Sequence, residues 1–127
     1  MIIMRKIIDK YINEIDSVYK THQATEATYR SILQNLLKIL LPKVMIIHEP
    51  KRSAYGVPDY QLIKDGIAIS FIETKNLNDK DLKGEKENIN KEQFDRYKLA
   101  LNTIVFTDYL TFYLFENGEL TRSASIG

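Results

Sequence analysis

The sequence contains no cysteine among its 127 residues. This absence excludes disulfide bonds, a thiolate metal site and a cysteine nucleophile. It agrees with the reducing cytoplasm, where we expect the protein to be located. The sequence also has no long apolar run, because charged residues interrupt its apolar first fifteen positions. Neither a signal peptide nor a membrane-spanning helix is predicted, and we expect no membrane partner.

The chain has little net charge, +1 at pH 7. A free-standing nucleic-acid-binding domain usually has a strongly basic surface. We therefore expect this chain to bind DNA only weakly on its own at physiological salt, because few phosphates can be neutralised. The sequence also lacks a phosphate-binding loop and an adenine-methylation motif of the Asp/Asn-Pro-Pro-Tyr type. If DNA is the substrate, other modules are expected to deliver the domain to it.

The composition is that of one globular domain over residues 1–127, with 44% hydrophobic and 28% charged residues. Apolar residues at three- and four-residue spacing predict a helix over 2–20 and a second helix that Pro42 ends. Strands are predicted where β-forming residues run between turn signals; they cover 44–49, 58–63, 67–75, 103–107 and 110–115, with 120–125 as a further candidate. A loop over 76–90 and a third helix over 88–101 complete the order. This order predicts an α/β fold with a mixed sheet of about five strands flanked by helices.

The strand at 67–75 ends in an unusual way. Side chains alternate across a strand, so one face is expected to carry the following residues: Ile67, Ile69, Phe71, Glu73 and Lys75. The first three are predicted core residues and the last two are ionisable. Burying a carboxylate and an ammonium group costs several kcal/mol unless they are paired or bind an ion. This end of the strand is therefore a candidate functional site.

Asp59 reaches the same face only if the preceding hairpin has the right loop length. A three-residue loop, Lys64-Asp65-Gly66, would place Ile63 opposite Ile67 and Asp59 opposite Phe71. A two-residue loop would place Asp59 on the other face unless a β-bulge compensates. Glycine at the third loop position suits a type I turn followed by a bulge. We therefore predict the three-residue loop and the convergence of Asp59 with Glu73 and Lys75.

This set of side chains suits phosphodiester hydrolysis. Two converging carboxylates are suitable ligands for Mg²⁺, which takes oxygen ligands and keeps several waters. Such an ion lowers the pKa of a bound water and shields the charge on a phosphate. A nearby lysine can position the attacking water or stabilise the transition state. The alternative is an ordinary Glu–Lys pair at the end of a surface strand.

The residues "PDY…ETK" resemble the motif of the PD-(D/E)XK nuclease superfamily. Further segments, "TEATYR", "HEPKRSAYGVPDYQL", "EQFDRYK" and "FTDYLTFYLFENGE", resemble the N-terminal nuclease domain of single-polypeptide restriction–modification enzymes. In the type ISP group of these enzymes, a helicase-like module and an adenine methyltransferase follow in the same chain. The resemblance covers roughly residues 25–119, so the helix predicted at 1–20 lies outside it.

The resemblance implies a role for each matched residue. Asp59 and Glu73 would hold Mg²⁺, for which Mn²⁺ can substitute, and the backbone carbonyl of Thr74 would be a further ligand. Lys75 would be the catalytic lysine. Glu26 matches an acidic residue that many members contribute from their N-terminal helix, although an acid in the first turn is also favourable by itself.

Two further pairs match less specific positions. Gln93 and Tyr97 match a Gln-x-x-x-Tyr pattern and would line the site or touch DNA. The alternative for them is a tyrosine at the edge of the core beside a solvated glutamine. Lys51 and Arg52 could grip a phosphate, or could be a solvated basic pair.

The function expected from this resemblance is that of a Mg²⁺-dependent DNA endonuclease domain in a restriction system that acts in phage defence on double-stranded DNA. Because one active site cuts one strand, double-strand cutting would need a dimer or two copies that converge on DNA. The alternatives are a DNA-repair or recombination nuclease of the same superfamily and a DNA-binding module that does not cleave.

Overall fold

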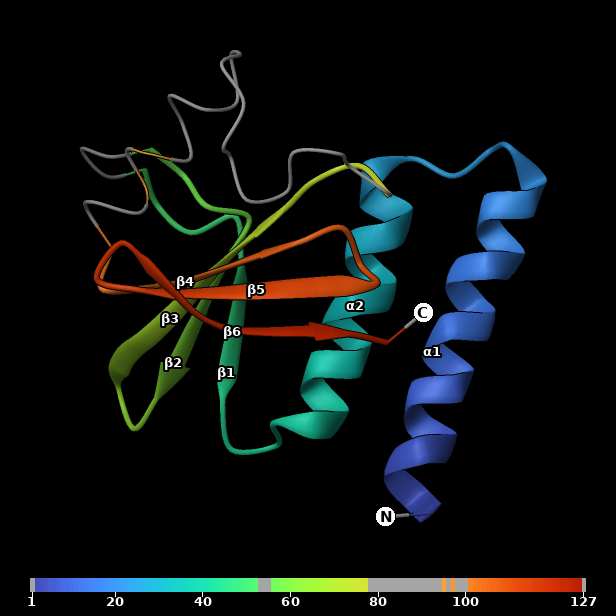
Figure 1. Ribbon diagram of the computed structural model, residues 1–127, viewed down its shortest axis with the longest axis horizontal. Coiled ribbons are helices and arrows are strands. Elements are labelled where there is room, and N and C mark those ends of the chain that lie inside the picture. The colour runs from blue at the N-terminus through green and yellow to red at the C-terminus, as the bar shows by residue number, and fades with distance from the viewer. Residues whose placement is uncertain (1, 53–55, 78–94, 96, 98–100, 127) are drawn as a thin grey trace.

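The computed structural model describes residues 2–52, 56–77, 95, 97 and 101–126. Two long helices, α1 (Ile2–Thr21) and α2 (Glu26–Leu40), come first in the chain and lie beside a sheet (Figure 1). Six strands follow: β1 (Met45–His48), β2 (Tyr60–Lys64), β3 (Ile67–Thr74), β4 (Thr103–Thr107), β5 (Thr111–Glu116) and β6 (Glu119–Ser125). The predicted third helix and the loop before it lie almost entirely outside the described residues.

The strands form one mixed sheet in the order β1-β2-β3-β4-β5-β6. Neighbouring strands are antiparallel except for β3 and β4, which run parallel. A parallel pair needs a long crossover connection, and the long segment between β3 and β4 provides it. The predicted α/β fold with a mixed sheet is therefore confirmed, with the 120–125 segment as a sixth strand.

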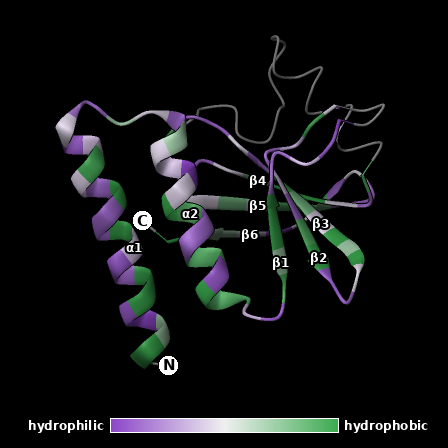
Figure 2. Cartoon of the chain, turned by 180° about the vertical axis from the view of Figure 1, so that it is seen from behind, coloured by the Kyte–Doolittle hydropathy of each residue, from purple (hydrophilic) through white to green (hydrophobic). Residues whose placement is uncertain are grey.

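One face of the sheet is covered by the helices. Figure 2 shows hydrophobic residues along the strands next to α2, and α1 packs on α2 from outside. The core on this face is built from buried side chains of both helices, of β2 and β3, and of the turn between β4 and β5: Tyr11, Ile15, Leu33, Leu36, Tyr60, Leu62, Ile72 and Tyr109. The first helix thus contributes to the same core as the sheet that carries the candidate site. Within the described part of the chain, no helix is long and apolar enough to cross a membrane.

The opposite face of the sheet has a second core. It contains Tyr97 and Leu101 together with Ile104, Phe106 and Phe115 from β4 and β5. Alternation along β3 divides neighbouring residues between the two faces: Phe71 packs on this second core and Ile72 on the helix-covered one. Because both faces are covered here, a charged side chain at this end of β3 is enclosed by protein.

A buried hydrogen bond ties α1 to the turn between β4 and β5. The Tyr11 hydroxyl donates to the backbone carbonyl oxygen of Tyr109 over 2.6 Å. We expect Tyr11→Phe to lower the free energy of unfolding by about 1–2 kcal/mol, because the buried carbonyl loses its donor. Urea denaturation measures the change. Tyr19→Phe is the control, because Tyr19 is 52% exposed on the same helix; equal effects of the two changes would contradict the prediction.

The hairpin between β2 and β3 differs from the prediction. The loop has two residues, Asp65 and Gly66, because Lys64 pairs with Ile67 and Ile63 pairs with Ala68. Both loop residues have positive φ, 52° and 78°. A two-residue turn of the type I′ class requires this conformation, which Asp-Gly readily adopts. The predicted three-residue loop is therefore wrong.

A β-bulge in β3 restores the geometry that the loop alone would have lost. The register shifts so that Leu62 pairs with Ser70, and Ile69 is the extra residue. Gln61, rather than Asp59, then lies opposite Phe71, and Tyr60 lies opposite Ile72. The next step along the ladder brings Asp59 to Glu73. The predicted pairings were wrong, but the compensating bulge keeps Asp59 beside Glu73.

Two of the predicted core residues of β3 are not in the core. Ile67 is 67% exposed and Ile69 is 43% exposed. Strand β4 pairs only with the second half of β3, from Phe71 to Thr74. The first half of β3 therefore projects beyond the covered part of the sheet, and its side chains meet solvent.

Candidate active site

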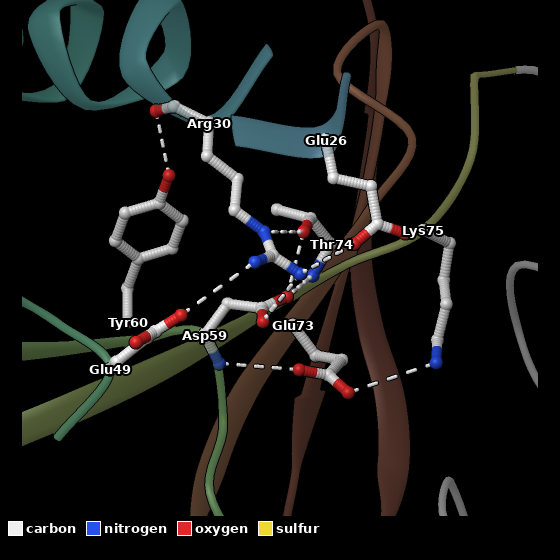
Figure 3. Close-up of polar contacts among 8 residues, drawn as sticks. All are labelled: Glu26, Arg30, Glu49, Asp59, Tyr60, Glu73, Thr74 and Lys75. Carbon is white, nitrogen blue, oxygen red and sulfur yellow. Dashed lines mark hydrogen bonds and ion pairs between the residues drawn. The ribbon is translucent and has the colours of Figure 1, made fainter. Parts of the chain in front are cut away.

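The candidate site lies at the covered end of β3, where the segment preceding β2 meets it (Figure 3). The backbone N–H of Asp59 donates to Oε1 of Glu73 over 3.2 Å. Nζ of Lys75 lies 3.7 Å from Oε2 of the same carboxylate. The side chains of Asp59, Glu73 and Lys75 are only 13%, 6% and 12% exposed. The structure thus places these three predicted residues together in a mostly enclosed position.

The carboxylate of Asp59 is held by a dense set of donors. Its Oδ2 accepts hydrogen bonds from the backbone N–H and the hydroxyl of Thr74, both over 2.7 Å. Its Oδ1 lies 2.9 Å from Nη2 of Arg30 on α2. Nε of Arg30 also donates to the Thr74 hydroxyl over 3.2 Å. Asp59 therefore has a fixed orientation, set by the two residues Arg30 and Thr74.

Neither Arg30 nor the Thr74 side chain was predicted to belong to this site. Thr74 was predicted only through its backbone carbonyl, although alternation puts its hydroxyl on the face opposite Glu73, toward α2. The sequence signal for Arg30 is its position four residues after Glu26, which makes the two neighbours on a helix. That spacing shows a pair on a helix but not the contact with a strand distant in sequence.

Glu73 has the most strongly perturbed acid–base behaviour in the site. Burial, followed by the negative charge of Asp59, raises the pKa of the Glu73 carboxyl to about 8, although the ammonium group of Lys75 acts in the opposite direction. Two carboxyl groups that share an enclosed site behave in this way, because the second charge is disfavoured. Without a bound cation, Glu73 is therefore mainly protonated at neutral pH.

Glu26 lies at the start of α2, beside this network. Its carboxylate oxygen Oε2 accepts a hydrogen bond from Nη2 of Arg30 over 3.2 Å, and its side chain is 67% exposed. Together with Thr74, Lys75 and Tyr109 it lines a cavity of about 200 Å³. The Glu26 carboxylate contacts Arg30, which in turn contacts Asp59, so the structure connects Glu26 to Asp59 through that guanidinium group.

The remaining predicted site residues lie in different surroundings. Tyr97 is 1% exposed and belongs to the second core; its predicted role at the site or on DNA stays a prediction. Gln93 lies outside the described residues. Lys51 and Arg52 are exposed and follow β1 in the chain. Their predicted contact with a phosphate stays a prediction.

Gly56 packs against Tyr97 three residues before Asp59. A Cβ atom at this position would lie 3.2 Å from the Tyr97 hydroxyl oxygen, and the φ of 112° is rarely adopted by residues with a side chain. We expect Gly56→Ala to lower the free energy of unfolding by about 1–3 kcal/mol. Gly66→Ala is the matched control, because Gly66 also has positive φ but has no atom within 4 Å of its added Cβ. A smaller loss for Gly56→Ala than for Gly66→Ala in urea denaturation would refute the importance of this close approach.

The chemistry of the donor set fits a hard divalent cation. Asp59 and Glu73 are neighbouring acids, and Thr74, the last residue of β3, has a backbone carbonyl oxygen that could serve as a further ligand. Among the described residues, no group of three or more His, Cys, Asp or Glu side chains could hold a metal. A cation here would therefore have two carboxylates and would complete its shell with water, as Mg²⁺ commonly does.

The fold of the chain is that of a restriction-endonuclease-like α/β domain. One chain of the cryo-EM structure of a DrdV–DNA complex has this fold. It matches the present chain with a TM-score of 0.75. The two chains are 19% identical, and the match covers 96% of this chain and 87% of the other. No protein-family model and no curated protein matches the sequence. The likeness at this identity establishes the fold.

Proposed function

We propose that this protein is a Mg²⁺-dependent DNA endonuclease domain of the PD-(D/E)XK superfamily and serves a restriction–modification system. The observation that carries the proposal is the buried carboxylate of Glu73, with its raised pKa, between Asp59 and Lys75. An enclosed acid beside a second acid lowers the stability of the fold and is not needed to form it. Such arrangements are typical of functional sites. The fold shared with a chain of the DrdV–DNA complex supports DNA as the substrate.

Asp59, Glu73 and the backbone carbonyl of Thr74 would hold the cation. When bound, Mg²⁺ supplies charge neutralisation at the phosphate and a more acidic water. Lys75 is the catalytic lysine in this proposal: its ammonium group, next to Glu73, would orient the attacking water and stabilise negative charge that develops on the phosphate. The Thr74 amide and hydroxyl keep the Asp59 carboxylate in position for this task.

DNA binding would depend on other modules of the same system. The net charge of +1 leaves few cations for the phosphate backbone. Lys51 and Arg52 are exposed and are the proposed phosphate contacts of the domain itself. Helicase-like and methyltransferase modules would bring the domain to its target, and two copies would be needed to cut both strands.

The test is cleavage of supercoiled plasmid by the purified chain at high protein concentration. We expect nicked and then linear DNA with Mg²⁺ or Mn²⁺, no conversion with EDTA, and at least about a hundredfold loss for Lys75→Ala. Lys64→Ala is the matched control and should keep full activity, because Lys64 is an exposed lysine at the opposite end of the same hairpin. Equal activity of wild type and Lys75→Ala would refute the proposal. DNA binding without cleavage by the wild type would instead favour a non-cleaving module.

A further inference from the structure

The carboxylate of Asp59 has most of its hydrogen-bonding capacity occupied. An ionised carboxylate offers about four lone-pair positions, two on each oxygen. The two donors of Thr74 occupy those of Oδ2, and the Arg30 guanidinium occupies one on Oδ1. A cation that binds Asp59 must therefore use the oxygen that Arg30 already contacts.

Arg30 and a divalent cation at this oxygen would repel each other. Coulomb repulsion scales with the product of the two charges, so a divalent cation repels the guanidinium group about twice as strongly as a monovalent cation at the same place would. The Arg30 side chain is 19% exposed, so water screens this repulsion only in part. The guanidinium group must either weaken cation binding or move away from Asp59.

The structure provides other acceptors for the guanidinium group. Nη2 lies 3.2 Å from Oε2 of Glu26, and Nη1 lies 4.0 Å from Oε1 of Glu49. Both glutamates are largely exposed, at 67% and 66%, and they lie on different sides of the Arg30 side chain (Figure 3). The backbone of Arg30 is held separately, because the Tyr60 hydroxyl donates to its carbonyl oxygen over 2.6 Å. Only the side chain would have to move.

We propose that Arg30 is an internal counter-cation that competes with the divalent cation for Oδ1 of Asp59, and that Glu26 and Glu49 receive its guanidinium group when the cation binds. Glu26 then acts through Arg30 as a positioning residue and not as a metal ligand. This inference rests on the metal site of the proposed function and adds a regulation of its affinity.

The test measures the affinity of the intact chain for Mn²⁺ by isothermal titration calorimetry, without DNA. Arg30→Met removes the charge and keeps an unbranched side chain. We expect it to bind Mn²⁺ roughly tenfold more tightly than the wild type. Arg30→Lys keeps a positive charge at this position, so its affinity for Mn²⁺ should stay within about threefold of that of the wild type. Circular dichroism and a thermal melt establish that each variant is folded.

Glu26→Gln provides an independent arm, because an exposed helix residue can be replaced without loss of folding. Loss of an alternative acceptor keeps Arg30 on Asp59, so Mn²⁺ binding should weaken by about threefold. In the Arg30→Met background, Glu26→Gln should leave the affinity for Mn²⁺ unchanged, because there is no guanidinium group for Glu26 to bind. A direct ligand role for Glu26 would weaken binding equally in both backgrounds and would overturn its assignment.

The possible failures are distinguishable. If the wild type binds Mn²⁺ and Arg30→Met binds it more weakly, Arg30 orients Asp59 and does not compete, and this inference is overturned while the metal site stands. If neither the wild type nor Arg30→Met binds Mn²⁺, the metal site itself fails, and the proposed function fails with it.

Discussion

Asp59→Asn is expected to lower the free energy of unfolding by about 2 kcal/mol and to abolish DNA cleavage. The amide that replaces the carboxylate has no charge to offset Arg30, and its NH₂ group cannot accept the hydrogen bonds that Thr74 and Arg30 donate. Breaking a fully buried ion pair costs about 3–5 kcal/mol. The smaller value applies here because Arg30 keeps its contact with the exposed Glu26.

Urea denaturation at neutral pH without divalent cations measures this change. Glu26→Gln is the control, because an exposed pair at i and i+4 contributes only about 0.3–0.5 kcal/mol. If Asp59→Asn is as stable as the wild type, the contacts of Asp59 with Thr74 and Arg30 do not contribute to stability as described above.

The charged carboxylate of Asp59 stabilises the fold, whereas a charge on Glu73 should destabilise it, and this effect should depend on pH. Burial in the folded protein raises the pKa of the Glu73 carboxyl from the ordinary value of 4.5 to about 8. Between these values the folded state binds more protons at this site than the unfolded state does, so ionisation of Glu73 destabilises the fold. The contribution of the neutral carboxyl is fully present below about pH 4.5 and is lost as the pH rises through about 8.

The comparison with Glu73→Gln isolates this contribution from other titrating groups. The wild type should lose on the order of 3–5 kcal/mol relative to Glu73→Gln between about pH 5 and about pH 9, in buffers with EDTA. Chemical denaturation at several pH values measures the difference. A difference that stays constant with pH, or that moves in favour of the wild type, would show that Glu73 is already ionised at neutral pH.

The fold could be predicted from the sequence where periodicity is long and turns are specific. The helix predicted at 2–20 is observed as Ile2–Thr21, and the strand predicted at 103–107 is observed with the same bounds. The β2–β3 hairpin was harder, because "KDG" is compatible with a two-residue and a three-residue loop. The bulge at Ile69 leaves no mark in a run of alternating apolar residues, so the register could not be derived.

The site was predictable only where its residues lie close together in the sequence. Asp59, Glu73 and Lys75 lie close in sequence on one hairpin, so their convergence could be predicted, although the loop length and the pairings from which it was derived were wrong. Arg30 comes from α2 and meets Asp59 only because that helix covers this face of the sheet (Figure 3). Its contact with Thr74, 44 positions away, depends on tertiary packing that periodicity does not specify. The same applies to Tyr97, whose place in the second core follows from packing with β4 and β5.

The most direct test of the proposed active site is single-turnover hydrolysis of an end-labelled DNA duplex by the wild type and Glu73→Gln, at about pH 8 with Mn²⁺. Glu73→Gln keeps the shape of the side chain and is expected to be at least as stable as the wild type at this pH, so unfolding cannot explain a loss of activity. We predict a rate at least about a hundredfold below that of the wild type. Hydrolysis by Glu73→Gln at the wild-type rate would contradict the assignment of Glu73 as a metal-binding residue of a nuclease.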